Sequence, residues 1–207
     1  QCATLFSMKY SIGIDEVGRG PIAGPVVVCA CALAQDVSVL DLYPKGVLRD
    51  SKKLTEKQRK SIVAGVEPFI QKKDIIYAIG VASAEYIDTY GIVPAIQSAI
   101  DCALNTLHKK GVSEDSFVFL DGGLRVNGKF SQQTIIRGDE KIVEISLASI
   151  FAKEYRDTLM REEAERFPGY GFESHVGYGT SAHYKALKEQ GVTPLHRKTF
   201  LKNEIKK

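Results

Sequence analysis

The stretch GIDEVGRGPIAGPVVV, at residues 13–28, contains the end of one expected strand, a glycine-rich turn and the start of a second strand. The run at residues 11–15 predicts a short buried strand, and the β-branched and small apolar residues at 25–33 predict another. Asp15 and Glu16 stand where the first strand ends, just before Gly18, Arg19 and Gly20. Sites in open α/β sheets form beyond strand ends, so this stretch is the first place to expect one.

Strand-like and helix-like segments are interspersed through the rest of the chain. Further strands are expected at residues 74–81, 117–120 and 133–136, and helices from residue 55 onward and at residues 83–91, 93–110, 145–167 and 180–190. Thr55 and Gln58 form a capping-box pattern at the start of the first helix. This order predicts an α/β fold with a mixed sheet. We expect a single domain over residues 1–207, a length that suffices for one substantial core.

The composition excludes several classes of protein. Hydrophobic residues make up 44% and charged residues 26%, which is typical of a globular domain. No apolar run reaches the ~18 residues of a membrane span, and no basic segment followed by an apolar stretch opens the sequence, so we expect neither a secretory signal nor membrane association. Cys2, Cys29, Cys31 and Cys102 lack the paired spacing of a zinc site. We expect Cys29 and Cys31 in the core and a cytoplasmic location.

The basic residues are unevenly distributed, although the net charge is only +3. Nine Lys and Arg lie between residues 45 and 73, and seven between 185 and 207. Two such clusters suit a protein that binds a phosphate backbone. Charge alone favours the simpler interpretation, in which both clusters are solvated helix faces.

Carboxylates follow three of the expected strands: Asp15 and Glu16 follow the first, Asp121 follows residues 117–120, and Asp139 follows residues 133–136 after a short turn. Several carboxylates gathered at one place would repel one another, and bound cations would remove that cost. Oxygen ligands without His or Cys suit Mg²⁺ or Mn²⁺, and two such ions ~3.5–4 Å apart can assist a phosphoryl displacement. An isolated Asp-Gly is more typical of a turn or helix cap than of a metal site, so spacing alone gives a weak metal-site hypothesis.

The sequence resembles the ribonuclease HII family in seven segments that occur in the family's order. These are GIDEVGRGP at 13–21, DSKKL at 50–54, LDG at 120–122, RGD at 137–139, SLASIFAKEYRD at 146–157, HVGYGT at 175–180 and PLHR at 194–197. Val17, Arg137 and Glu154 depart from the family's usual Ala, Lys and apolar residues, and none of these changes removes an expected ligand.

The resemblance implies a ribonuclease H-like fold, in which a mixed sheet is flanked by helices and a small helical C-terminal part, about residues 170–207, contributes to substrate binding. It implies a metal-dependent endoribonuclease that cuts the RNA strand of RNA/DNA hybrids, cuts 5′ of ribonucleotides embedded in duplex DNA, and leaves 5′-phosphate and 3′-hydroxyl ends. Such an enzyme would serve ribonucleotide excision in DNA replication and repair. The implied catalytic and metal-binding residues are Asp15, Glu16, Asp121 and Asp139, with two Mg²⁺ or Mn²⁺ ions. Asp157 is held in reserve because its place after Arg156 on a helix is more typical of an ion pair.

The resemblance also implies how substrate is read. Gly18, Arg19 and Gly20 would sense the ribonucleotide, and glycines allow the close backbone approach that a 2′-OH contact needs. Tyr178 would pack on the next deoxyribose. Ser51, Lys52 and Arg19 would hold phosphates.

Two alternatives remain open at this point. A ribonuclease HIII-like enzyme would act mainly on longer hybrids and usually carries an extra N-terminal domain, for which Asp15 lies too near the start. A non-catalytic hybrid-binding module would explain the basic clusters but would gain nothing from carboxylates beside phosphates. We expect a monomer, and we assign His108, His175, His183 and His196 structural rather than chemical roles.

Overall fold

A computed structural model describes residues 10–38, 42, 51–128 and 130–201, and it shows one mixed five-stranded sheet with the strand order β3-β2-β1-β4-β5. β1 pairs antiparallel with β2 and parallel with β4; β2–β3 is antiparallel and β4–β5 is parallel. The strands are β1 (Tyr10–Val17), β2 (Val26–Ala34), β3 (Ile75–Ala82), β4 (Phe117–Asp121) and β5 (Gln132–Ile135). The expected α/β class with a mixed sheet is therefore confirmed.

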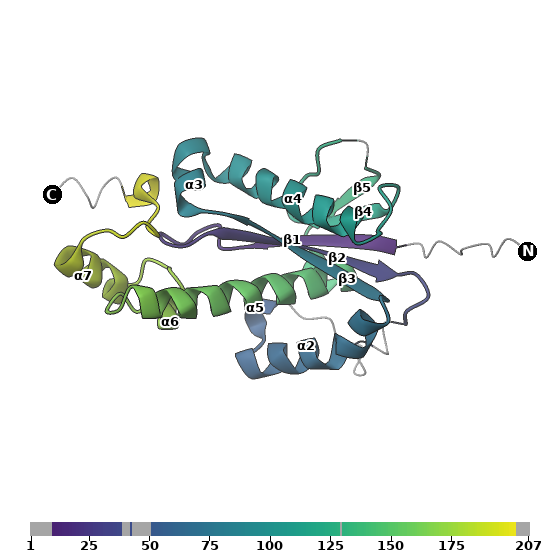
Figure 1. The fold of residues 1–207 in the computed structure, drawn as a ribbon, viewed down its shortest axis with the longest axis horizontal. Helices are drawn as coiled ribbons and strands as arrows, with labels where there is room; N and C mark the ends of the chain where they lie inside the picture. Colours follow the sequence, from purple (N-terminus) through teal and green to yellow (C-terminus); the bar gives the residue numbers. More distant parts are fainter. Residues whose placement is uncertain (1–9, 39–41, 43–50, 129, 202–207) are drawn as a thin grey trace, which may run out of the picture.

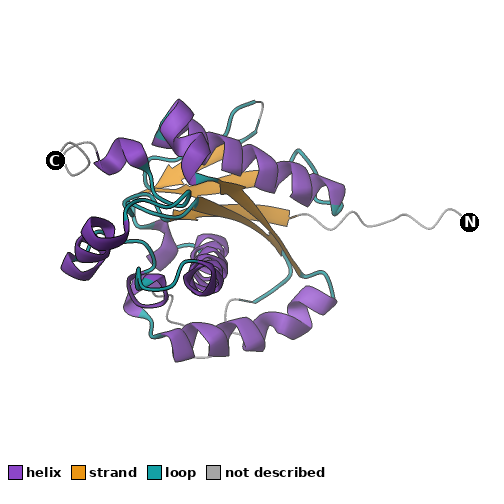
Figure 2. Ribbon diagram, turned by 60° about the vertical axis from the view of Figure 1, so that its left-hand side comes forward, coloured by secondary structure: helices purple, strands orange, loops and turns teal. Residues whose placement is uncertain are grey.

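Helices cover both faces of the sheet (Figures 1 and 2). Helix α4 lies on one face, and α5 and α2 lie on the other. The α-helices are α2 (Glu56–Gln71), α3 (Ala84–Tyr90), α4 (Ile92–Lys109), α5 (Val143–Arg166), α6 (Phe172–His175) and α7 (Ser181–Gln190), and the 3-10 turns are η1 (Ser51–Lys53), η2 (Gly138–Glu140) and η3 (Lys198–Leu201). All expected strands and helices are present, with ends shifted by a few residues.

Local sequence signals explain where helices begin. The Thr55 side chain accepts a hydrogen bond from the backbone N–H of Gln58, and the Gln58 side chain accepts one from the backbone N–H of Thr55. The expected capping box is therefore present. The side chains of Ser83 and Thr180 cap α3 and α7, and each accepts a hydrogen bond from the backbone N–H three residues further along the chain. These caps satisfy backbone donors that a helix cannot satisfy internally.

The two cores follow from the alternation of side chains along β1 and β2. Ile12 and Ile14 pack on the α4 side, whereas Cys29 and Cys31 pack on the α5 side and are buried, as expected. Ser11, Gly13, Asp15 and Val17 therefore share the α5 side of β1.

Glycines let the two large helices approach the sheet closely. A Cβ at Gly13 would lie 2.1 Å from the carbonyl carbon of Glu144 in α5, and one at Gly80 would lie 1.9 Å from the carbonyl oxygen of Ala99 in α4. Because no larger residue fits there, these two glycines set the distance between the sheet and the helix on each face.

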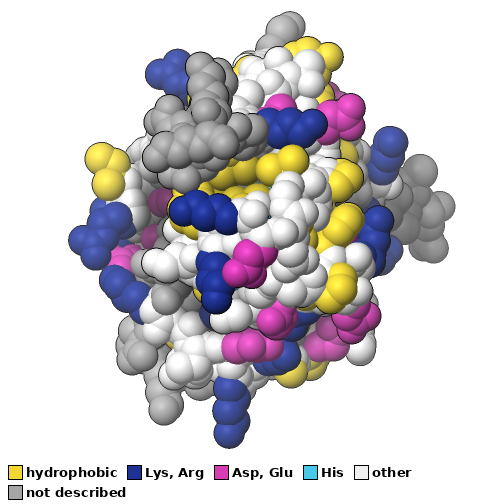
Figure 3. Space-filling model, turned by 90° about the vertical axis from the view of Figure 1, so that its left-hand side faces the viewer, with side chains coloured by type: hydrophobic (Ala, Val, Ile, Leu, Met, Phe, Trp, Pro, Cys, Tyr) yellow, Lys and Arg dark blue, Asp and Glu magenta, His cyan; other side chains and the backbone are white. Residues whose placement is uncertain are grey.

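The basic residues that cluster in the sequence do not all lie on the surface of the protein. Figure 3 shows the end of the molecule that carries α6 and α7, where basic and acidic side chains are interspersed. Arg59 is buried in an ion-paired site, and Arg197 is completely buried, so both belong to the interior rather than to a solvated face. Lys45, Arg49 and the tail from residue 202 lie outside the described residues. Within the described part of the chain, no helix is long and apolar enough to cross a membrane.

Candidate active site

Asp15 and Glu16 occupy the C-terminal end of β1. Asp15 is 5% exposed, and its Oδ1 accepts a 2.8 Å hydrogen bond from the backbone N–H of Glu16. Because successive side chains leave a strand on opposite faces, Asp15 points to the α5 side and Glu16 to the α4 side. The two carboxyl groups therefore leave the end of β1 on opposite faces of the sheet.

Asp121 lies beside Asp15 because the parallel pairing of β1 and β4 places Ile14 opposite Leu120. Both aspartates follow these partners by one residue, so they share the same face and the same edge of the sheet. The backbone N–H of Gly138 donates a 2.7 Å hydrogen bond to Asp121 Oδ1 and fixes that carboxylate.

Asp139 reaches this region through η2, the short turn that follows β5. It is 7% exposed and directly follows Gly138, the residue that holds Asp121. A Cβ at Gly138 would lie 2.5 Å from Ile145 Cδ1, so a larger residue would require the buried Ile145 side chain of α5 to move. Arg137 enters the turn in the left-handed conformation, with φ 55°. The carboxyl group of Asp139 is thus buried one residue away from the amide that binds Asp121.

The electrostatics show that the acids are close to one another. Burial raises the pKa of Asp15 to about 8, a hydrogen bond from the Ser149 side chain opposes this shift, and the charges of Glu16 and Asp121 add to it. A carboxylate with such a pKa is destabilised in its ionised form, and a bound cation would reverse that penalty.

The donor set fits a hard divalent cation, since the acids offer only oxygen ligands and their mutual repulsion calls for positive charge. Among the described residues, no three His, Cys, Asp or Glu side chains are already arranged around a common point as a closed metal site. The structure brings Asp15, Glu16 and Asp121 into electrostatic contact and places Asp139 at the neighbouring turn.

Gly18, Arg19 and Gly20 form the turn beyond β1. Gly18 has φ 87°, and a Cβ there would lie 2.3 Å from Arg156 Nε, so this position admits only glycine. Arg19 is exposed, and its guanidinium lies 3.6 Å from a carboxylate oxygen of Glu16. The turn is therefore continuous with the acidic end of β1.

Tyr178 lies next to this turn. Its ring is exposed at 45%, and a Cβ at Gly20 would come within 4.0 Å of Tyr178 Cε1. An exposed aromatic ring beside a bare glycine backbone leaves a flat apolar surface next to polar main-chain groups. Such a pair suits a sugar ring.

Two buried arginines hold the segment from Gly18 to Pro25. Arg156 donates to the carbonyls of Pro25, Ala23 and Val176. Arg197 donates to the carbonyls of Gly24, Arg19 and Gly18 at 2.9, 3.1 and 2.6 Å.

Burial lowers the pKa of Arg156 to about 10 and that of Arg197 to about 9, because an apolar environment disfavours the charged form. Sequence reasoning gave neither arginine a role. The RD and PLHR matches were the available signals, but spacing could not show that the guanidinium groups are internal.

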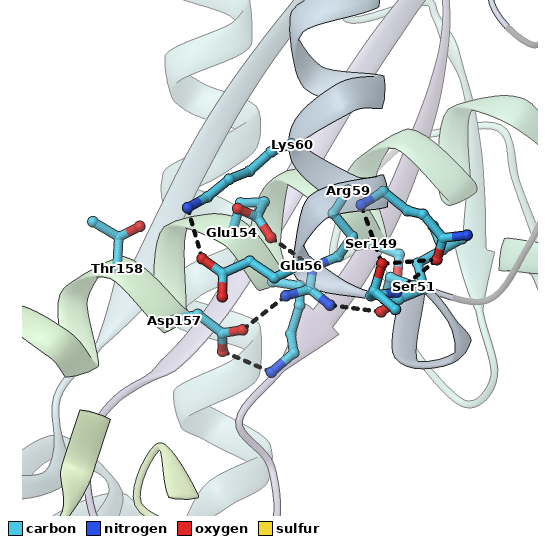
Figure 4. Close-up of polar contacts among 12 residues, drawn as sticks. Ser51, Glu56, Arg59, Lys60, Ser149, Glu154, Asp157 and Thr158 are labelled. Carbon is cyan, nitrogen blue, oxygen red and sulfur yellow. Dashed lines mark hydrogen bonds and ion pairs between the residues drawn. The ribbon is translucent and has the colours of Figure 1, made fainter. Parts of the chain in front are cut away.

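Ser51 is 2% exposed and is hydrogen-bonded to Ser149 at 2.7 Å (Figure 4). Ser149 in turn hydrogen-bonds to the Asp15 carboxyl group. Ser51 therefore lies behind Asp15 and not on an open surface where a phosphate could reach it. The side chain of Lys52 lies outside the described residues.

Asp157 is engaged elsewhere. Its carboxylate pairs with Arg59 at 3.2 Å and with Lys153 at 2.6 Å, and Arg59 also pairs with Glu154 (Figure 4). This buried network joins α2 to α5, which agrees with the expected ion pair. The structure does not bring Asp157 into the group of Asp15, Glu16 and Asp121.

Two hollows of the described part of the chain lie away from the acids. One, of about 320 Å³, is lined by Tyr77, Phe151 and Tyr155 among others, and another, of about 450 Å³, lies between α3 and residues 192–198. None of the four acids lines either hollow.

The chain is similar to ribonucleases H in sequence and in structure. The family model described as Ribonuclease HII matches residues 12–203. A ribonuclease HII of Chlamydia caviae is 45% identical over 192 residues, which cover 91% of this chain and 82% of that protein. A ribonuclease HII of Shouchella clausii is 40% identical over 188 residues, which cover 91% of this chain and 67% of that protein.

Solved structures share the fold. The RNase HII of Archaeoglobus fulgidus, solved in a complex with PCNA, superposes with a TM-score of 0.69 at 22% identity and covers 91% of this chain and 93% of that chain. Bst-RNase HIII in complex with Mn²⁺ gives 0.63 at 15% identity and covers 95% of this chain and 66% of that chain. The expected ribonuclease H-like architecture is therefore confirmed.

Proposed function

Because this chain belongs to the ribonuclease HII family of metal-dependent endoribonucleases, we propose that it cuts 5′ of ribonucleotides embedded in duplex DNA as well as along the RNA strand of RNA/DNA hybrids. The observation that supports this most is the adjacency of two features at one end of β1. The buried Asp15 and its charge-coupled neighbour Asp121 lie there, and the turn that follows holds Gly20 beside the exposed residue Tyr178. One feature suits hydrolysis of a phosphodiester and the other suits recognition of a sugar.

In this proposal Asp15, Glu16, Asp121 and Asp139 hold two divalent ions, Mg²⁺ or Mn²⁺, when substrate is bound. Bound divalent ions supply activation of the attacking water and stabilisation of the departing 3′ oxygen. The chain's own contribution is to fix the oxygens: the Gly138 amide orients Asp121, and the Ser149 hydroxyl and the Glu16 amide orient Asp15. Hydrolysis would leave 5′-phosphate and 3′-hydroxyl ends.

Substrate choice in this proposal depends on the sugar. Gly18 and Gly20 allow main-chain groups to approach a 2′-OH, which is the group that distinguishes RNA from DNA. Tyr178 packs on the deoxyribose of the next nucleotide, where a 2′-OH would be unfavourable. Arg19 is exposed and available to a phosphate, whereas Ser51 would have to leave Ser149 to bind one.

The deciding experiment is magnesium-dependent cleavage of a DNA duplex that contains one ribonucleotide, with the cut site mapped. We expect a cut immediately 5′ of the ribonucleotide. Asp15→Asn and Asp121→Asn should each reduce the rate by at least about a thousandfold, because each removes a charged ligand at the reacting phosphate. Asp36→Asn is the control and should cleave normally, because Asp36 is exposed and lies just beyond Ala34, at the opposite end of the sheet from Asp15. Normal cleavage by both site variants would refute the acid assignment.

Two alternatives make different predictions. A ribonuclease HIII-like enzyme would cut a uniform RNA/DNA hybrid and leave the single ribonucleotide intact. A hybrid-binding module would bind both duplexes without cutting either, and its affinity would not fall when Asp15 or Asp121 is made neutral. Monomeric state and cytoplasmic location remain predictions from the sequence.

A further inference from the structure

Three segments that are distant in sequence form one hydrogen-bonded unit beside the proposed sugar site. The backbone N–H of Gly24 donates to the carbonyl of Leu195, and that of Arg197 donates to the carbonyl of Ile22, both at 2.8 Å. The N–H of Ile22 donates to the carbonyl of Gly177 at 2.9 Å. The turn after β1, the Tyr178 loop and the segment 193–197 are therefore fixed relative to one another.

Arg197 sets the orientation of two peptide groups in the turn. Its guanidinium binds the carbonyls of Gly18 and Arg19 from inside the protein. In a trans peptide, the C=O of one residue and the N–H of the next point in opposite directions. Holding both carbonyls inward therefore turns the N–H groups of Arg19 and Gly20 away from Arg197, toward the side where substrate would lie.

His196 acts on the Tyr178 loop through a chain of hydrogen bonds whose direction is fixed. The backbone N–H of Thr193 donates to His196 Nδ1 at 2.9 Å, so the proton of neutral His196 is on Nε2. That Nε2 lies 3.0 Å from His183 Nε2, which must accept. The remaining proton of His183 is then on Nδ1, which donates to the carbonyl of Tyr178 at 2.9 Å.

The surroundings of the two imidazoles keep them neutral and in place. His183 is stacked on His175 with ring centroids 4.4 Å apart, and Phe172 packs edge-on against His183. His183 and His196 are 0% and 1% exposed. Because each ring is enclosed, neither can adopt another hydrogen-bonded arrangement without disturbing the chain that ends at Tyr178.

We propose that His196 and Arg197 are positioning residues for substrate selection. Arg197 holds the Gly18–Gly20 turn, and His196 holds Tyr178 through His183. Two consecutive residues therefore fix the distance between the turn that would contact the ribonucleotide and the ring that would pack on the deoxyribose. This inference rests on the proposed function, since it takes the turn and Tyr178 to be the parts that read substrate. The bonds of Arg197 go to the turn and those of His196 reach the Tyr178 loop through His183, so loss of either residue should change which substrate is cut more than the chemical step itself.

The test of the histidine uses two isosteric variants. In His196→Asn the amide oxygen can replace Nδ1 as the acceptor for Thr193, but the side chain is too short to reach His183. In His196→Gln the amide nitrogen can replace Nε2–H as the donor to His183. The measured quantity is the ratio of kcat/KM on a duplex with one ribonucleotide to kcat/KM on a uniform RNA/DNA hybrid. We expect His196→Asn to lower this ratio about three- to tenfold, the effect of one hydrogen bond, and His196→Gln to keep it within about twofold.

The test of the arginine uses a matched control. Arg197 and Arg59 are both buried, but Arg59 binds Glu154, Asp157 and the carbonyl of Leu54, all outside the Gly18–Gly20 turn and the Tyr178 loop. We expect Arg197→Lys to lower the selectivity ratio, and Arg59→Lys to lower thermal stability without changing that ratio. All assays are run well below the melting temperature of each variant, and if Arg197→Lys does not fold, the His196 pair decides.

The outcomes separate this inference from the proposed function. If Tyr178→Ala lowers the ratio while His196→Asn and Arg197→Lys leave it unchanged, the positioning role is wrong. The proposed recognition of the sugar by Tyr178 would then stand. If Tyr178→Ala also leaves the ratio unchanged, the proposed sugar site fails, and this inference fails with it. Equal losses on both substrates in every variant would indicate a structural role only.

Discussion

Asp15 combines burial with two charged neighbours, and this combination determines how the empty and the metal-bound site differ in energy. Burial and the charges of Glu16 and Asp121 raise its pKa to about 8, so the ionised carboxylates destabilise the folded chain. A divalent cation bound among them would replace repulsion with attraction. The protein should therefore be measurably more stable in the presence of its metal.

This gives a prediction at the scale of the residue. Mg²⁺ or Mn²⁺ at about 100 times its dissociation constant should stabilise the protein by about 2.7 kcal/mol, which for a chain of this size is a rise of about 5–10 °C in melting temperature. Asp121→Asn should lose most of this rise, because one ligand and one charge are missing. Differential scanning calorimetry with and without the metal measures both. An equal rise in the two proteins would place the metal elsewhere.

Tyr178 allows a second prediction at this scale. The residue is 45% exposed, so removing its ring gives up only part of the burial that a core tyrosine would lose. Tyr178→Ala should lower kcat/KM on a duplex with one ribonucleotide by about tenfold, the effect of about 1.4 kcal/mol of lost sugar contact. The melting temperature should change by no more than a few degrees. Tyr178→Phe keeps the ring and should retain most of the activity; unchanged kinetics in the alanine variant would remove the proposed role.

At the scale of the element, the approach of α5 to the sheet depends on Gly13. The first turn of α5 rests directly on this glycine, and the same helix carries Ser149 to Asp15. Helix position and carboxylate orientation are therefore linked through one close contact.

Gly13→Ala should destabilise the protein by about 1–3 kcal/mol, since the added Cβ meets backbone atoms of Glu144 and Ile145 that cannot move independently. Gly65→Ala is the matched control: Gly65 is an exposed interior position of α2 with nothing within 4 Å of an added Cβ. This control should stabilise the protein by about 0.5–1 kcal/mol. Urea unfolding of both variants measures the difference, and equal effects would contradict the packing argument.

The elements themselves could be predicted from the sequence because their signals are local. Alternation and turn residues located β1 and β2, and the Thr55 capping box located the start of α2. The adjacency of Asp15 and Asp121 also followed from the rule that sites form at strand ends. Arg59, Arg156 and Arg197 could not be placed, because the groups that accept from them in the interior come mostly from segments about 95–180 residues away. Ser51 was expected to hold a phosphate, and its burial against Ser149 could not be predicted for the same reason, since Ser149 lies 98 residues away.

At the scale of the whole molecule, the buried histidines make stability depend on pH. Burial lowers the pKa of His183 and lowers that of His196 to about 4, so the unfolded chain takes up these protons first, near pH 6.5. Their contribution is thus fully present above pH 6.5 and is lost as the pH falls toward about 4. Asp15, with a raised pKa, acts in the opposite direction over part of this range.

His196→Gln isolates the histidine contribution, because Asp15 contributes equally to both proteins and cancels in their difference. The free energy of unfolding of the wild type should fall by about 2 kcal/mol more than that of the variant between pH 7 and pH 4.5. Urea titrations at several pH values in metal-free buffer measure this. Parallel pH profiles for the two proteins would show that His196 is not held neutral by the fold.

The position of segment 193–197 in the polypeptide matters during translation. Asp15, Asp121 and Asp139 are synthesised before this segment, so a growing chain already contains the acids while the hydrogen bonds made by His196 and Arg197 cannot yet form. At elongation rates of about 5–20 residues per second this interval lasts a few seconds. A product that ended before residue 193 would contain all four acids but would lack every hydrogen bond by which His196 and Arg197 act on the Tyr178 loop and the Gly18–Gly20 turn.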